Sequence, residues 1–102
     1  DAVVSFHGDL LSPTLKADAS ATQAKVLVLH GAADPYVPQS DVQTFVDVML
    51  PTDVDWQLIQ YSQAVHSFTN PDANSPGQSA YDVVTAERSF EAMFDLFDEM
   101  WD

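Results

Sequence analysis

The chain has 102 residues, enough for one domain with a modest core, and 46% of them are hydrophobic, as in a globular protein. Its 16 acidic residues outnumber 3 basic ones, and the net charge of -13 argues against binding to nucleic acid or to anionic membrane surfaces. The sequence holds no cysteine, which excludes disulfides, thiolate metal sites and a Cys nucleophile within it, and the lack of a leader or a long apolar run predicts a cytoplasmic protein.

The first third of the chain predicts two strands. Residues 2–6 and residues 25–29 are short apolar runs, and each is followed by a His-Gly pair. The second run has no polar alternation, which is typical of a parallel strand buried on both faces. Residues 9–23 show no periodicity, so we expect a surface connection there.

The next segment predicts an amphipathic helix over residues 40–50. Ser40 and Gln43 have the spacing of a capping box, and Pro51 ends the helix. The apolar positions form one stripe: Val42, Phe45, Val46, Met49 and Leu50.

A third strand is predicted at residues 55–61, followed by a long loop over residues 62–77. A second amphipathic helix follows at residues 79–101. We expect its apolar face in the core: Val84, Phe90, Met93, Phe94, Phe97 and Trp101. The order of elements predicts the fold class α/β, with a small parallel sheet of about three strands and helices packed on it, in one domain over residues 1–102.

Two chemically capable side chains follow neighbouring strands. Asp34 lies in the loop that Gly31 opens after the second strand, and His66 lies in the loop after the third. Open α/β sheets place their chemistry at the carboxyl ends of the strands, so we expect these side chains within hydrogen-bond distance, as the acid and base of a nucleophile-His-Asp triad. Taken alone, Asp34 is also a common turn residue before Pro35, and His66 an ordinary surface histidine.

Two motifs carry a resemblance to a known family: HGAADP at residues 30–35 and VHSFTNP at residues 65–71. In this order they resemble the C-terminal part of the dienelactone hydrolase family of α/β-hydrolases, and the similarity covers nearly the whole chain. The resemblance implies that the three strands are the last of the parent sheet and that the reaction is ester or lactone hydrolysis. It also implies that Asp34 orients His66 and that His66 is the general base.

The sequence departs from that family in two respects. The family keeps a Cys or Ser nucleophile in a G-x-C/S-x-G elbow upstream of the strand at residues 2–6, and no such elbow is present here. Available hydroxyls include Ser5, Ser62, Ser67 and Ser75, but none of them lies in such an elbow. Where dienelactone hydrolases proper carry an arginine that grips the substrate carboxylate, this chain has Asn70, so a small anionic lactone lacks a charge partner. We therefore expect the chain alone to be inactive.

A zinc site is the other hypothesis for the histidines. His7 and His30 each follow a strand and could join Asp34 as ligands. The sequence has neither H-x-x-x-H nor H-x-H spacing, and both His-Gly pairs have a family explanation, so we expect no metal and no cofactor.

Two functions of different class remain open. The chain is either the C-terminal part of a hydrolase, whose nucleophile a separate polypeptide supplies or truncation removes, or a non-catalytic module of the same ancestry that binds a partner or small ligand. In both cases the strand at residues 2–6 lacks its upstream neighbour, which leaves an open edge and an apolar surface. We therefore expect self-association, most simply as a two-fold dimer.

Overall fold

A computed structural model describes residues 2–8 and 24–101. Three parallel strands form the main sheet in the order β1-β2-β3: β1 (Ala2–Phe6), β2 (Lys25–Gly31) and β3 (Trp56–Tyr61). Two helices and a two-stranded antiparallel pair complete the fold: α2 (Gln39–Met49), α3 (Val83–Trp101), β4 (Asn74–Ser75) and β5 (Ser79–Ala80). The predicted α/β class is confirmed, while the connection predicted at residues 9–23 lies outside the described residues.

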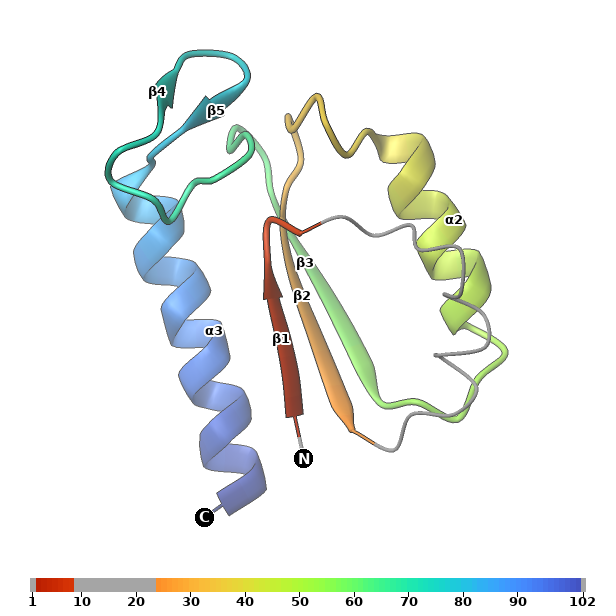
Figure 1. The fold of residues 1–102 in the computed structure, drawn as a ribbon. Helices are drawn as coiled ribbons and strands as arrows, with labels where there is room; N and C mark the ends of the chain where they lie inside the picture. Colours follow the sequence, from red (N-terminus) through yellow and green to blue (C-terminus); the bar gives the residue numbers. More distant parts are fainter. Residues whose placement is uncertain (1, 9–23, 102) are drawn as a thin grey trace.

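The three strands run in the same direction, so all of them end at one edge of the sheet (Figure 1). Helix α2 covers one face of the sheet and α3 covers the other. The register pairs Phe6 with Leu29 and Gly31 with Tyr61, which brings the loops that follow β1, β2 and β3 to the same end of the molecule.

The central strand β2 supplies core residues to both faces, as its uninterrupted apolar run predicts. The buried cluster on the α2 side is Val28, Val37, Val42, Phe45 and Met49. The buried cluster on the α3 side is Leu27, Leu29, Ala64, Phe68 and Leu96. Leu27 is 1% exposed and Leu29 0%, and burial of each such side chain contributes about 1.5–3 kcal/mol. Phe68, only two residues from His66, anchors the predicted site loop in this core.

The predicted core face of α3 is largely wrong. Three of the four buried residues of the helix have short side chains, and only Leu96 is large: Thr85, Ala86, Ser89 and Leu96. Met93 and Phe97 are partly buried, but four of the six predicted core residues are exposed to solvent: Val84 (49%), Phe90 (41%), Phe94 (56%) and Trp101 (67%). Ser89 is fully buried, and its Oγ donates a hydrogen bond of 2.8 Å to the Ala86 carbonyl, which satisfies the buried hydroxyl within the helix itself.

The helix starts also differ from the prediction. Helix α2 begins at Gln39 after an extended Pro38, no side chain caps it, and Gln43 donates to Asp47 at 2.8 Å, so the capping box at Ser40 is wrong. Pro38 is the N-cap residue, where the lack of an N–H and the fixed φ of proline are tolerated because the helix starts only after it. Helix α3 begins at Val83 and not at residue 79, because Asp82 caps it by accepting a hydrogen bond of 3.2 Å from the Thr85 N–H.

At the opposite end of the sheet from the predicted site, one cation ties three elements together. The Nζ of Lys25, at the start of β2, lies 3.2 Å from the carboxylate of Asp55 before β3 and 2.9 Å from that of Glu99 in α3.

Neither helix of the described residues combines the length and the apolar composition that a membrane span requires.

Candidate active site

The loop after β2 lies in direct backbone contact with the loop after β3. Gly31 makes this contact possible, because a Cβ at this position would lie 2.5 Å from the Ala64 carbonyl oxygen and 2.7 Å from that of Val65. The Ala33 N–H then donates to the Ala64 oxygen at 3.0 Å. The Gly in the first motif is thus a steric requirement that brings the Asp34 and His66 loops together.

Asp34 uses both oxygens of its carboxylate. Oδ1 accepts hydrogen bonds from the Tyr36 N–H at 2.8 Å and the Val37 N–H at 3.3 Å, which closes a local turn. Oδ2 accepts from Nδ1 of His66 at 2.9 Å. One side chain therefore makes both the turn contacts and the contact with His66, which were alternatives in the sequence. The side chain of Asp34 is fully buried.

His66 is held by backbone pairing with the segment around β5. Its N–H donates to the Gln78 carbonyl at 3.2 Å, and its carbonyl accepts from the Ala80 N–H at 3.0 Å. The next residue, Ser67, has a φ of 60°, in the left-handed region where a side chain carries a conformational cost. The loop after β3 is long but ordered by these bonds around the histidine.

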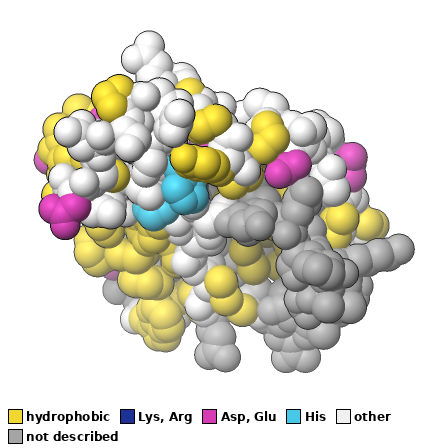
Figure 2. Space-filling view, turned by 45° about the horizontal axis from the view of Figure 1, so that its top comes forward, with side chains coloured by type: hydrophobic (Ala, Val, Ile, Leu, Met, Phe, Trp, Pro, Cys, Tyr) yellow, Lys and Arg dark blue, Asp and Glu magenta, His cyan; other side chains and the backbone are white. Residues whose placement is uncertain are grey.

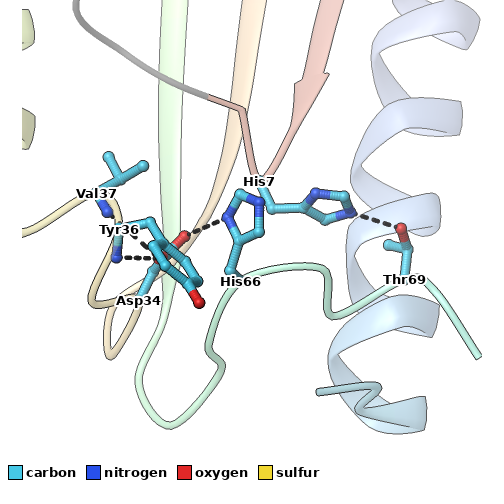
Figure 3. Close-up of polar contacts among 6 residues, drawn as sticks. All are labelled: His7, Asp34, Tyr36, Val37, His66 and Thr69. Carbon is cyan, nitrogen blue, oxygen red and sulfur yellow. Dashed lines mark hydrogen bonds and ion pairs between the residues drawn. The ribbon is translucent and has the colours of Figure 1, made fainter. Parts of the chain in front are cut away.

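Two further rings flank the imidazole of His66 (Figure 3). The ring of Tyr36 lies edge-on at a centroid distance of 5.3 Å, and the ring of His7 lies edge-on at 5.6 Å. His7 comes from the end of β1, so all three strands of the sheet contribute a side chain here. Nε2 of His7 and the hydroxyl of Thr69 share a hydrogen bond of 2.8 Å.

The pair lies where solvent and a reactant can reach the histidine but not the carboxylate. The side chain of His66 is 31% exposed and that of Asp34 is 0% exposed. Figure 2 shows histidine side chains reaching the surface between hydrophobic ones at the carboxyl end of the sheet. Because Nδ1 of His66 donates to Asp34, Nε2 is the nitrogen that an attacking hydroxyl or thiol would face.

Comparison with known proteins agrees with this geometry. The sequence pattern described as the dienelactone hydrolase family matches residues 1–101. The chain belongs to the dienelactone hydrolase family.

Two solved structures and one curated protein show how much of a family member is present. A dienelactone hydrolase-like promiscuous phosphotriesterase from metagenomic libraries is 44% identical with a TM-score of 0.85, and the match covers 96% of this chain and 41% of that one. A structure named m3DLH is 40% identical with a TM-score of 0.86, covering 99% of this chain and 42% of that one. An uncharacterised protein of Caenorhabditis elegans is 33% identical over 104 residues, which are 96% of this chain and 63% of that protein. The chain thus spans less than two thirds of these relatives.

In this dienelactone hydrolase-family chain, the predicted proximity of Asp34 and His66 is confirmed. The sequence does not predict that the rings of His7 and Tyr36 contact the ring of His66. The position of His7 could have indicated this contact, because it directly follows a parallel strand of the same sheet. The sequence analysis considers His7 only as a metal ligand. Tyr36 lies two residues from Asp34 in a loop, and its identity carries no periodic signal.

The third histidine occupies a different environment. His30 is 1% exposed on β2, and neither of its ring nitrogens has a hydrogen-bond partner among residues 2–8 and 24–101. Burial lowers the pKa of His30, and the nearby Asp34 charge only partly opposes this. Within the described part of the chain, no three His, Cys, Asp or Glu side chains are arranged to hold a metal ion.

Proposed function

We propose that these residues supply the acid-base half of an ester or lactone hydrolase active site. In this proposal His66 is the general base that takes a proton from a nucleophile through Nε2, and Asp34 fixes its tautomer and orientation. The hydrogen bond of 2.9 Å from Nδ1 of His66 to the buried carboxylate of Asp34 is the observation that carries it. Membership of the dienelactone hydrolase family supports the choice of reaction.

The nucleophile and the oxyanion hole belong to a segment outside these residues in this proposal. The three glycines are Gly8, Gly31 and Gly77, so the sequence contains no pair spaced as in G-x-S-x-G. The chain covers 41% and 42% of the two solved relatives, which leaves room for such a segment, either on the same polypeptide or on a second one. Oxyanion stabilisation is usually the largest catalytic contribution, so activity requires that segment.

We infer that the substrates are neutral esters. Asn70 stands where a carboxylate-gripping arginine would be expected from the resemblance, and a net charge of -13 disfavours anionic substrates. Phosphotriesters are neutral too, and the 44% identical relative is named as a promiscuous phosphotriesterase, so they are the second substrate class to test.

The test is a chimera that joins residues 1–102 to the upstream part of that relative. We expect it to hydrolyse p-nitrophenyl esters, and we expect His66→Ala to abolish the turnover. Asp34→Asn should lower kcat by about 10⁴-fold, as loss of the orienting carboxylate does in Ser-His-Asp enzymes. A chimera that melts cooperatively but shows no His66-dependent turnover of any neutral ester would contradict the proposal.

The chain by itself should be catalytically silent. An acid-base pair without a nucleophile or an oxyanion hole lacks the groups that contribute most to the rate. Purified residues 1–102 should hydrolyse p-nitrophenyl esters and simple lactones no faster than the His66→Ala variant. Clear His66-dependent turnover would reveal a substitute nucleophile within this chain.

A non-catalytic interaction module is the second candidate, and the outer surface of α3 is the observation in its favour. Phe94 and Trp101 are 56% and 67% exposed, which is unusual for large apolar side chains on one helix. The same surface and the open edge of β1 support self-association of the chain, most simply as a dimer. Light scattering at micromolar concentration tests this, and a strictly monomeric, folded species would contradict it.

A further inference from the structure

His7 is linked to the loop of His66 by two kinds of contact. Its Nε2 is hydrogen-bonded to the Thr69 hydroxyl at 2.8 Å, across 62 residues of sequence. Its ring lies edge-on against His66 at 5.6 Å and against Phe68 at 5.0 Å. The partners of His7 are therefore His66 itself and the second and third residues after it.

Two residues at this contact have a conformationally costly backbone: His7 itself and Ser67, which lies between His66 and Thr69. His7 has a φ of 44° and Ser67 has a φ of 60°, and neither is a glycine. A left-handed conformation costs roughly 1–2 kcal/mol per residue, so surrounding contacts must hold it. For His7 these include the hydrogen bond from its N–H to the Leu29 carbonyl at 2.9 Å, which continues the pairing of β1 with β2. The side chain of His7 thus starts from a fixed point on the sheet.

His7 is suited to stand beside a general base because its surroundings favour the neutral imidazole. Burial lowers its pKa, the nearby His66 lowers it further, and a hydrogen bond with its own backbone and the charge of Asp34 oppose these effects. The lowered pKa favours the neutral imidazole of His7, which supplies a hydrogen bond and a packing surface without a positive charge. When His66 takes up a proton, no second cation competes with it for Asp34.

We propose that His7, acting through Thr69, is a positioning residue that holds the imidazole of His66 in line with Asp34. The loop after β3 is long, and a catalytic ring must keep its orientation within about 10–20°. The bonds to Gln78 and Ala80 fix the backbone of His66. In this proposal, the ring of His7, held by its bond to Thr69, fixes the side of the His66 ring that faces the end of β1. Only the catalytic consequence of this proposal rests on the proposed hydrolase function.

The test uses the Nδ1–H proton of His66, which is observable by NMR in the isolated chain when its hydrogen bond to Asp34 persists. We expect Thr69→Val, which keeps the shape but removes the hydroxyl, to lose this signal through fast exchange with water. Thr69→Ser should retain it. His7→Leu should lose it and His7→Gln, whose amide can still reach the hydroxyl, should retain it at least in part. The thermal midpoint of each variant reports whether it is folded.

Equal exchange of the His66 proton in Thr69→Val and Thr69→Ser overturns the proposal, and so does an unchanged signal in a folded His7→Leu variant. If His7→Leu does not fold, the matched Thr69 pair still decides. In the chimera, Thr69→Val should lower kcat with little change in KM. Because the NMR measurement needs no turnover, an inactive chimera would contradict the hydrolase function and leave the positioning role standing.

Discussion

The loops after β2 and β3 deliver the two members of one hydrogen-bonded pair in opposite ways. The Asp34 loop is closed on itself, since Asp34 N–H donates to the Gly31 carbonyl at 3.0 Å and its carboxylate binds the next two free N–H groups. The His66 loop depends on distant partners, among them Gln78 and the His7–Thr69 bond. A carboxylate can be placed by a short local motif, whereas an imidazole in a long loop is placed by tertiary contacts.

The largest effect is expected where the two loops touch. Gly31→Ala would place a methyl group against the carbonyl oxygens of Ala64 and Val65, which are backbone atoms that cannot rotate away. We expect this variant to lose about 3 kcal/mol of unfolding free energy in urea titration. Gly77→Ala is the control, because Gly77 has a φ of 80° but open space around it, so only the conformational cost of about 1 kcal/mol applies. Equal losses in both variants would show that the loops are not in close contact.

The locally closed loop can be opened by removing its acceptor. Asp34→Ala leaves the buried Val37 N–H without its partner and should cost about 2 kcal/mol. Asp34→Asn keeps one acceptor oxygen for the turn and should cost about half as much. Urea titration gives the free energies, and faster amide exchange at Tyr36 and Val37 in the Ala variant alone would locate the loss. Indistinguishable Ala and Asn variants would contradict the turn role.

Buried His30, at the end of β2, should make the unfolding free energy sensitive to acid. The pKa of buried His30 is lowered, so the unfolded chain binds a proton more readily than the folded one as the pH falls below about 6.5. The stability contributed by neutral His30 is therefore complete above that pH and is lost as the pH falls toward the lowered pKa. Urea titrations at pH 7.5 and 5.5 should show a smaller loss in His30→Leu than in the unmodified chain.

His7 shifts in the same direction and serves as a comparison in that experiment. Its pKa is lowered chiefly by burial, so His7→Gln should also reduce the loss of unfolding free energy between pH 7.5 and 5.5. The double variant with His30→Leu should reduce it more than either single variant. An identical loss of unfolding free energy in the unmodified chain and all three variants would mean that neither histidine is buried in its neutral form.

The smallest effect is expected in the His66 loop itself. Ser67→Gly relieves the cost of a φ of 60°, while the flexible unfolded chain opposes the gain, so the stability should stay within about 0.5 kcal/mol or rise. Ser75→Gly in β4 has no such relief and should cost about 0.5–1 kcal/mol. A loss at residue 67 that matches the loss at residue 75 would show that the left-handed turn is not populated in solution.

The same contrast explains how far the sequence could be interpreted. The strands and the Asp34–His66 pair were predictable because apolar runs, a Gly and the shared edge of parallel strands are local or topological signals. The buried face of α3 was not predictable, because Thr85 and Ser89 are polar residues and yet lie on the buried side of the helix. His7 was missed as a partner of His66 because its role depends on a hydrogen bond across 62 residues.

The two contacts of Lys25 have a chemical consequence far from the site. Both Glu99 and Asp55 raise the pKa of the Lys25 ammonium, so little of the free amine is present to attack an acylating reagent at neutral pH. Fraying of the last turns of α3 would remove the Glu99 partner and speed the reaction. The rate of acylation at this one amine therefore reports the docking of the terminal helix, at the end of the sheet opposite to the Asp34–His66 pair.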